Sequence, residues 1–180
     1  MNILLINGSP RKNGNSSFIL DKLKEKYSGE NVKELILNDL LYKGCQGCLS
    51  CRKNNSYCVV KDDLQDILPK MIENDFIVII SPNYYGFITG QLKTFLDRWY
   101  CLKDSNKMSK FNDTKVFFIV VQGASNRDHS ENILDWSKKV LESFNLKYYG
   151  YTIPGCSHEN HDMVQMKYPE LSMHINMFVG

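Results

Sequence analysis

The chain has 180 residues, 43% of them apolar, which is enough for one substantial hydrophobic core and too few to indicate two domains. Twenty-two Lys and Arg against twenty Asp and Glu leave a net charge of +2 with no long run of either sign, which argues against a nucleic-acid groove or an anionic membrane surface. The longest apolar runs, residues 116–121 and 76–80, are too short to span a membrane, and the apolar start is too short for a signal peptide. We therefore expect a soluble, cytoplasmic protein that forms one domain over residues 1–180.

The N-terminal stretch predicts a strand, a loop and the start of a helix. Residues 3–6 form an apolar run that ends at Gly8 and Pro10, and an amphipathic pattern begins near Asn15. Two common phosphate motifs are excluded by counting. A Walker A loop has four residues between its glycines and then a lysine, whereas five lie between Gly8 and Gly14 here and Asn15 follows; the G-x-G-x-x-G fingerprint is also missing.

The same loop nevertheless has the chemistry of an anion site. The hydroxyls of Ser9, Ser16 and Ser17 and free backbone N–H groups would face the positive end of the following helix, with Arg11 beside them. An ordinary capped turn between a strand and a helix explains these residues equally well, so the loop alone leaves both interpretations open.

The remaining elements follow from the spacing of apolar residues. Helices are predicted at about 15–28, from a capping box at Asp62 to 72, from the N-cap Thr89 to 100, and at 130–144; strands are predicted at 32–37, 76–80, 116–121 and 146–153. Residues 38–61 have no period, and a loop of that length is usually functional. Five strands alternating with four helices predict an α/β fold, a doubly wound parallel sheet in the order 2-1-3-4-5 with helices on both faces.

Three loops leave the carboxyl ends of these strands and meet at one rim: residues 7–17, 81–90 and 122–126. The second loop offers two aromatic faces, Tyr84 and Tyr85, and a close backbone approach at Gly86, while Gly123 and Ala124 of the third loop lack bulk. A ligand with a phosphate at one end and a flat polar ring at the other fits all three loops, and FMN is such a ligand. For an isolated tyrosine pair, the alternative is ordinary packing of a surface loop.

Several strings in these loops occur together: Gly8-Ser9-Pro10-Arg11 with Gly14-Asn15-Ser16, Ser81-Pro82-Asn83-Tyr84-Tyr85-Gly86, and Gly90-Gln91-Leu92-Lys93 with Asp97-Arg98. In combination they resemble the NADPH-dependent FMN reductase branch of the flavodoxin-like superfamily, over residues 2 to about 125. The resemblance implies that the FMN phosphate is held by Ser9, Arg11, Asn15, Ser16 and Ser17, and the isoalloxazine ring by Pro82, Asn83, Tyr84, Tyr85 and Gly86.

The resemblance also implies a homodimer, which could pair further into a tetramer, with Lys93, Asp97 and Arg98 on a helix near the partner subunit. The third loop departs from the family pattern, because Gln122-Gly123-Ala124 stands where the family often has Thr-Gly-Gly. Gly123 and Ala124 are still expected to bring backbone amides to the ring.

A cysteine-rich insertion at about 42–61 holds Cys45, Cys48, Cys51 and Cys58. Three thiols at two-residue gaps and a fourth further on suit a [4Fe-4S] cluster, with zinc as another four-cysteine option and unmetallated thiols as a third. The arrangement resembles the compact motif of iron-sulfur flavoproteins, although Val59 replaces the proline that follows the last cysteine in ferredoxins. Cys101 is expected to be a buried helix residue.

A C-terminal extension at about 155–180 contains the stretch Gly155-Cys156-Ser157-His158-Glu159-Asn160-His161-Asp162. Its spacing matches no metal motif, so these residues are expected to be solvated loop residues. Met163, Met166, Met173 and Met177 are expected to pack the extension against the body or a second subunit.

The predicted function is an FMN-dependent oxidoreductase that transfers hydride from NAD(P)H to a small acceptor such as a quinone, a nitro or azo compound, or free flavin. No side-chain acid, base or nucleophile is needed for that chemistry, so we expect no catalytic residue. The alternative is an iron-sulfur flavoprotein that carries electrons to or from a redox protein through a cluster on the four cysteines.

Overall fold

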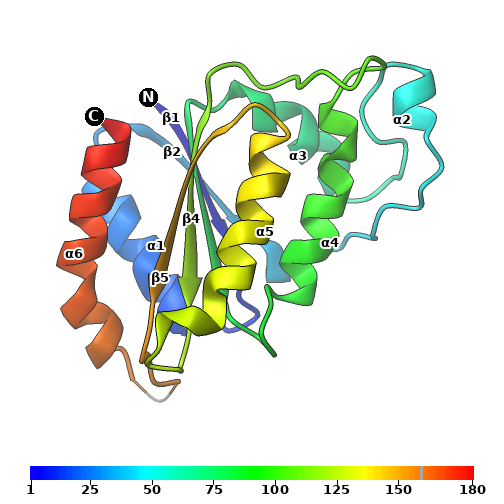
Figure 1. Ribbon diagram of the computed structural model, residues 1–180. Helices are drawn as coiled ribbons and strands as arrows, with labels where there is room; N and C mark the ends of the chain where they lie inside the picture. Colours follow the sequence, from blue (N-terminus) through cyan, green and yellow to red (C-terminus); the bar gives the residue numbers. More distant parts are fainter. Residues whose placement is uncertain (159) are drawn as a thin grey trace.

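Figure 1 shows the computed structural model, which describes residues 1–158 and 160–180; Glu159 of the predicted tail lies outside the described residues. Five parallel strands form one sheet in the order β2-β1-β3-β4-β5. They are β1 (Asn2–Asn7), β2 (Asn31–Ile36), β3 (Phe76–Pro82), β4 (Lys115–Val121) and β5 (Lys147–Ile153). The predicted flavodoxin-like strand order is confirmed.

Helices cover both faces of the sheet (Figure 1). One face carries α1 (Asn15–Lys26) and α6 (Asp162–Val179), and the other carries α3 (Leu64–Lys70), α4 (Gly90–Arg98) and α5 (Glu131–Glu142). The short helix α2 (Ser50–Lys53) lies in the cysteine-rich loop. In the described part of the chain, four 3₁₀ turns complete the elements: η1 (Leu37–Asp39), η2 (Met71–Glu73), η3 (Trp99–Leu102) and η4 (Arg127–Ser130).

The central strands are apolar throughout because both of their faces are covered. In β3, Ile77 and Ile79 pack with the core beneath α3, α4 and α5, whereas Val78 and Ile80 pack with the core beneath α1 and α6. All four side chains are fully buried. This alternation across a pleated strand is what a doubly wound sheet requires, and it places the strand ends at a fixed rim.

The start of α4 is tied to the end of β1. Thr89 is the predicted N-cap: its Oγ1 accepts the Leu92 N–H at 3.3 Å and donates to the Gly8 carbonyl at 2.6 Å. The Gly8 N–H in turn donates to the Ile80 carbonyl at 2.8 Å. A Cβ at position 8 would lie 3.0 Å from Leu92 Cβ and 3.1 Å from the Ile80 oxygen, so only glycine fits without a shift. The first and second loops therefore leave the sheet side by side.

The C-terminal extension contains α6, a helix that the apolar pattern does not predict. Met163 is half-buried and packs with the core on the α1 face, but Met166, Met173 and Met177 are exposed. These three therefore do not pack against the body, and the expected alternative, packing against a second subunit, stays a prediction. The helix instead buries Val164, Leu171 and Ile175. Within the described residues, no helix is long and apolar enough to cross a membrane.

Candidate functional site

A cavity of about 300 Å³ opens at the carboxyl edge of the sheet, and all three predicted loops line it. Of the predicted site residues, its lining includes Ser9, Arg11, Asn15, Ser16, Pro82, Asn83, Tyr84 and Gly123. Ser17, Tyr85, Gly86 and Ala124 do not line it. The strand order thus brings together residues that are more than 100 positions apart in the sequence.

The first loop is shaped by hydrogen bonds among its own residues. Asn7 at the end of β1 accepts the Ser9 N–H on its Oδ1 at 2.9 Å and donates from Nδ2 to Ser17 Oγ at 3.1 Å. The Ser17 hydroxyl then donates to the Arg11 carbonyl at 3.2 Å. Ser17 therefore holds the turn of the loop rather than facing the cavity, while the buried Ser16 lines it.

The N-terminus of α1 points at this cavity without a side-chain cap. Its first intrahelical hydrogen bond runs from the Phe18 N–H to the Gly14 carbonyl. The backbone N–H groups of residues 15–17 therefore have no acceptor within the helix. The exposed Arg11 lies at the same end. Amides at the positive end of a helix together with a guanidinium form a site for an anion such as phosphate.

The opposite part of the cavity is built from the second and third loops. Asn83 donates from Nδ2 to Gln122 Oε1 at 3.2 Å, and Gln122 donates from Nε2 to the Asn126 carbonyl at 2.6 Å. Asn83 Oδ1 is buried and has no hydrogen-bond partner among the described residues. Asn83, with this unpartnered buried acceptor, and Tyr84 both line the cavity at this end.

Tyr85 and Gly86 are displaced from the cavity by a tight turn. The main chains of Tyr84 and Phe87 exchange hydrogen bonds of 2.8 and 3.1 Å, which leaves the two residues between them at its tip. Both tip residues have positive φ, 54° at Tyr85 and 78° at Gly86, and the Tyr85 side chain is fully exposed. Of the predicted pair, Tyr84 lines the cavity and Tyr85 does not.

The four cysteines of the insertion line a second cavity of about 300 Å³ together with the apolar side chains of Leu49, Val59, Val60 and Tyr100. All six cysteines of the chain are free thiols. Within residues 1–158 and 160–180, no three His, Cys, Asp or Glu side chains come close enough to hold a metal ion. The insertion thus gathers four soft ligands around one apolar space without bringing them to ligating distance.

The thiols of the insertion differ in acidity. Hydrogen bonds from the side chain and N–H of Ser50 lower the pKa of Cys48 below its ordinary value. Burial, with a smaller effect of nearby Cys58, raises the pKa of Cys51. Burial also raises the pKa of Cys101 to about 11, in agreement with its predicted place in the core. Because the thiolate is the form that binds metals and attacks disulfides, Cys48 is the most readily engaged of these three.

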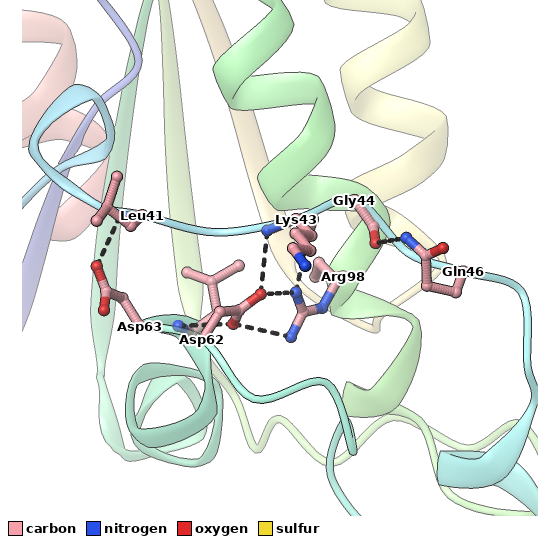
Figure 2. A network of polar contacts seen from close by, with 8 residues as sticks. Leu41, Lys43, Gly44, Gln46, Asp62, Asp63 and Arg98 are labelled. Atoms are coloured by element: carbon pink, nitrogen blue, oxygen red, sulfur yellow. Dashed lines mark hydrogen bonds and ion pairs between the residues drawn. The ribbon is translucent and has the colours of Figure 1, made fainter.

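The base of the cysteine loop is closed by a buried ion pair, shown in Figure 2. Arg98 of α4 points at Asp62, with Nη1 and Nη2 at 2.6 and 3.2 Å from its carboxylate oxygens, and also donates to the Lys43 carbonyl at 2.7 Å. Asp62 accepts the N–H groups of Lys43 and Leu64 at 3.0 and 3.1 Å. Asp63 accepts the Leu41 N–H at 2.6 Å. The two ends of the insertion are therefore held together on α4.

This arrangement alters two expectations. Asp62 still contributes to the start of α3, but its main partner is Arg98 rather than a capping-box residue. The Arg98 side chain has no exposed surface, so it faces the interior of its own subunit. Of the three helix residues implied to lie near a partner, Lys93 and Asp97 have exposed side chains, and they pair with each other at 2.6 Å.

The family of the chain follows from its sequence as a whole. The family model described as NADPH-dependent FMN reductase matches residues 1–151. The chain belongs to this family. An iron-sulfur flavoprotein of Archaeoglobus fulgidus is 42% identical over 100 residues, which are 54% of this chain and 48% of the relative. An iron-sulfur flavoprotein of Methanosarcina thermophila is 32% identical over 142 residues, 76% of this chain and 72% of the relative.

Among solved structures, an FMN-dependent NADH-azoreductase from Bacillus anthracis in complex with FMN has a TM-score of 0.75 over 100% of both chains at 15% identity. This likeness shows that the two proteins share a fold. The chain of this FMN reductase family member spans about half the length of three of the curated iron-sulfur flavoproteins that it matches, 48%, 51% and 50%.

Other residues line the cavity of this FMN reductase family member but are absent from the predicted site. Asn13, Gly14 and Gln122 belong to the predicted loops, and Val121 is the last residue of β4. Cys156, Ser157, His158 and His161 come from the C-terminal extension, which was expected to be a solvated loop. Their spacing in the sequence does not indicate a site. They reach the cavity through contacts with Asn13 and Asn15, which lie more than 140 positions away.

Proposed function

We propose that this chain is an FMN-dependent NAD(P)H oxidoreductase. The observation that carries the proposal is one cavity that joins an anion site at the start of α1 to a polar, aromatic-lined pocket between the second and third loops. The residues suit FMN: the uncapped helix and Arg11 match its phosphate, and the unpartnered Asn83 Oδ1 matches the ring N–H of isoalloxazine. When bound, FMN would accept a hydride from nicotinamide and deliver electrons to a small acceptor.

The protein residues would then bind and orient. Ser9, Arg11, Asn15 and Ser16 would hold the phosphate, with Ser17 fixing the loop behind them. Pro82, Asn83, Tyr84 and Gly123 would contact the ring, while Tyr85, Gly86 and Ala124 would shape the two loops that carry these contacts. Hydride delivery from the nicotinamide requires no side-chain acid, base or nucleophile of the cavity. Catalysis would therefore rest on positioning and electrostatics.

The test is anaerobic rapid mixing of the FMN-loaded chain with NADPH and, separately, with NADH. We expect the visible flavin absorbance to bleach, and a quinone, a nitro or azo compound, or free flavin to restore it over repeated turnovers. Flavin that stays oxidised in the presence of both nicotinamides, although dithionite reduces it, would contradict the proposed hydride transfer.

We propose as a second candidate an electron carrier with a [4Fe-4S] cluster on Cys45, Cys48, Cys51 and Cys58. The specific observation in its favour is that all four thiols line one apolar cavity, and four thiolates are the donor set of such a cluster. The insertion would have to close further around the cluster than it does here. Its partner would be a redox protein rather than a nicotinamide.

Iron and acid-labile sulfide per flavin, measured after anaerobic purification, test this second candidate. We expect about four of each per FMN in the unaltered chain and a loss of most iron in Cys48→Ser, because a [4Fe-4S] cluster needs all four thiolates. Cys101→Ala is the matched control, since that cysteine is buried outside the cavity and should leave the iron content unchanged. Flavin without iron or sulfide in the unaltered chain would rule the cluster out.

We further propose that the chain acts as a homodimer or tetramer in the cytoplasm. The exposed Lys93–Asp97 pair on α4 is compatible with a subunit contact there, and six unpaired thiols fit a reducing compartment. Light scattering on the FMN-loaded chain measures the assembly directly, and a monomer at micromolar concentration would contradict it.

A further inference from the structure

The segment that connects β5 to α6 contributes Cys156, Ser157, His158 and His161 to the lining of the proposed flavin cavity. We call residues 155–158 and 160–161 the tail segment. At its start it is held to the third loop, because the Gly155 N–H donates to the Ala124 carbonyl and the Cys156 N–H to the Gln122 carbonyl, both at 2.9 Å. The preceding carbonyl, that of Pro154, accepts from Lys167 Nζ at 2.6 Å. The beginning of the tail segment is thus fixed above β4.

At its other end the tail segment reaches the first loop. Asn15 donates from Nδ2 to the Ser157 carbonyl at 2.6 Å, across 142 positions of sequence. His161 Nε2 lies 3.0 Å from the Asn13 carbonyl, an acceptor, so this nitrogen carries the proton and donates. The His161 ring also packs on Phe18, with ring centroids 5.2 Å apart. Two hydrogen bonds and a ring contact therefore join the extension to the loop at the start of α1.

The tail segment places two imidazoles in the lining of the cavity that also holds the proposed anion site. His158 and His161 both line the cavity, and His158 is an exposed residue. Among the described residues of the lining, Arg11 is the one arginine or lysine. A phosphate monoester carries about −1.5 to −2 charges at neutral pH and accepts hydrogen bonds on three oxygens. The guanidinium of Arg11 and the N-terminus of α1 would neutralise only part of this charge. Some of the phosphate oxygens would still need a further hydrogen-bond donor.

We propose that the tail segment is the outer wall of the phosphate site, with His158 as a further phosphate ligand and His161 as the positioning residue that holds the wall against the first loop. This inference rests on the proposed FMN site and makes it more specific: the extension selects the phosphorylated flavin over riboflavin, which has the same ring and no phosphate. The tail segment lies outside the sheet. The C-terminal helix α6 then serves the site because it anchors this segment, through Lys167 and the Pro154 carbonyl.

The experiment compares dissociation constants for FMN and riboflavin, measured by quenching of flavin fluorescence on the full chain. In His158→Ala, FMN affinity should fall about tenfold, the loss expected for one charge-assisted hydrogen bond, whereas riboflavin affinity should change less than about twofold. His161→Ala should show the same selectivity with a smaller effect. His161→Gln should restore FMN affinity, because its amide N–H can donate to the Asn13 carbonyl.

His129→Ala is the matched control, since this exposed histidine does not line the cavity, and its FMN affinity should equal that of the unaltered chain. Thermal melting of each variant separates loss of fold from loss of a ligand. The inference is overturned if FMN affinity is unchanged in His158→Ala, or if FMN and riboflavin weaken equally. Failure of the unaltered chain to bind FMN would instead overturn the proposed function itself, so the two failures are distinguishable.

Discussion

Arg98→Met should lower the free energy of unfolding by about 3–5 kcal/mol, the largest effect that we expect from a single change. The Asp62 side chain is only 7% exposed, and without the guanidinium it would be a buried carboxylate with no cation beside it. The Lys43 carbonyl would lose its donor at the same time. Urea unfolding followed by circular dichroism measures the change.

Two controls give this result its meaning. Lys93→Met breaks the exposed pair with Asp97 on the same helix and should cost less than about 0.5 kcal/mol. Adding Asp62→Asn to Arg98→Met should recover part of the lost stability, because the uncompensated charge is then gone. A cost below about 1 kcal/mol for Arg98→Met would show that the ion pair does not hold the base of the cysteine loop.

The same pair sets a dependence on pH. Burial alone would raise the pKa of Asp62, but hydrogen bonds from the Arg98 side chain and the Lys43 N–H hold it below its ordinary value of 3.8. A carboxylate with a lowered folded-state pKa stabilises the fold above its unfolded-state pKa, and this contribution is lost as the pH falls through the lower value. The difference in stability between the unaltered chain and Asp62→Asn should therefore be full at pH 7 and shrink below pH 3.8.

The double change Arg11→Ala and Ser16→Ala should weaken FMN binding by at least about a hundredfold. It removes a cation and a buried hydroxyl that line the anion end of the cavity. Hydrogen bonds that involve a charged group contribute about 1.5–3 kcal/mol each, and about 2.7 kcal/mol corresponds to a hundredfold change in affinity. A fluorescence titration with FMN, repeated with riboflavin, measures the effect and shows whether it belongs to the phosphate.

Lys12→Ala is the matched control for charge, because Lys12 neighbours Arg11 in the same loop but does not line the cavity, and its FMN affinity should stay within about twofold of the unaltered chain. FMN affinity that survives the double change would mean that the phosphate does not lie at the start of α1. Equal weakening of riboflavin would point to collapse of the loop instead.

Local sequence signals predict the sheet and the rim of this protein well. Continuous apolar runs such as residues 76–80 are buried on both faces, and Thr89 caps α4 as its position before an amphipathic stretch indicates. Because parallel strands end at the same edge, the three loops that follow them had to meet, and eight of the predicted site residues line one cavity.

Other features depend on contacts that no local pattern encodes. Arginine is rarely buried without a partner, so Arg98 is expected at the surface until Asp62, 36 positions away, is seen beside it. The tail segment joins the cavity through residues more than 140 positions distant. In α6, methionines fall on the exposed side and a proline lies inside the helix, which obscures its apolar stripe. Tyr85 does not line the cavity because it lies at the tip of a tight turn, with a positive φ.

The measurement that tests the central claim most directly is an equilibrium titration of the flavin-free chain with FMN, followed by flavin fluorescence and repeated on the Arg11→Ala, Ser16→Ala variant. We predict saturable binding of one FMN per chain, tighter than binding of riboflavin and weakened by at least about a hundredfold in the variant. Identical affinity for FMN and riboflavin would contradict a phosphate site at the start of α1. Binding of neither flavin by the folded chain would contradict the cavity as the cofactor site.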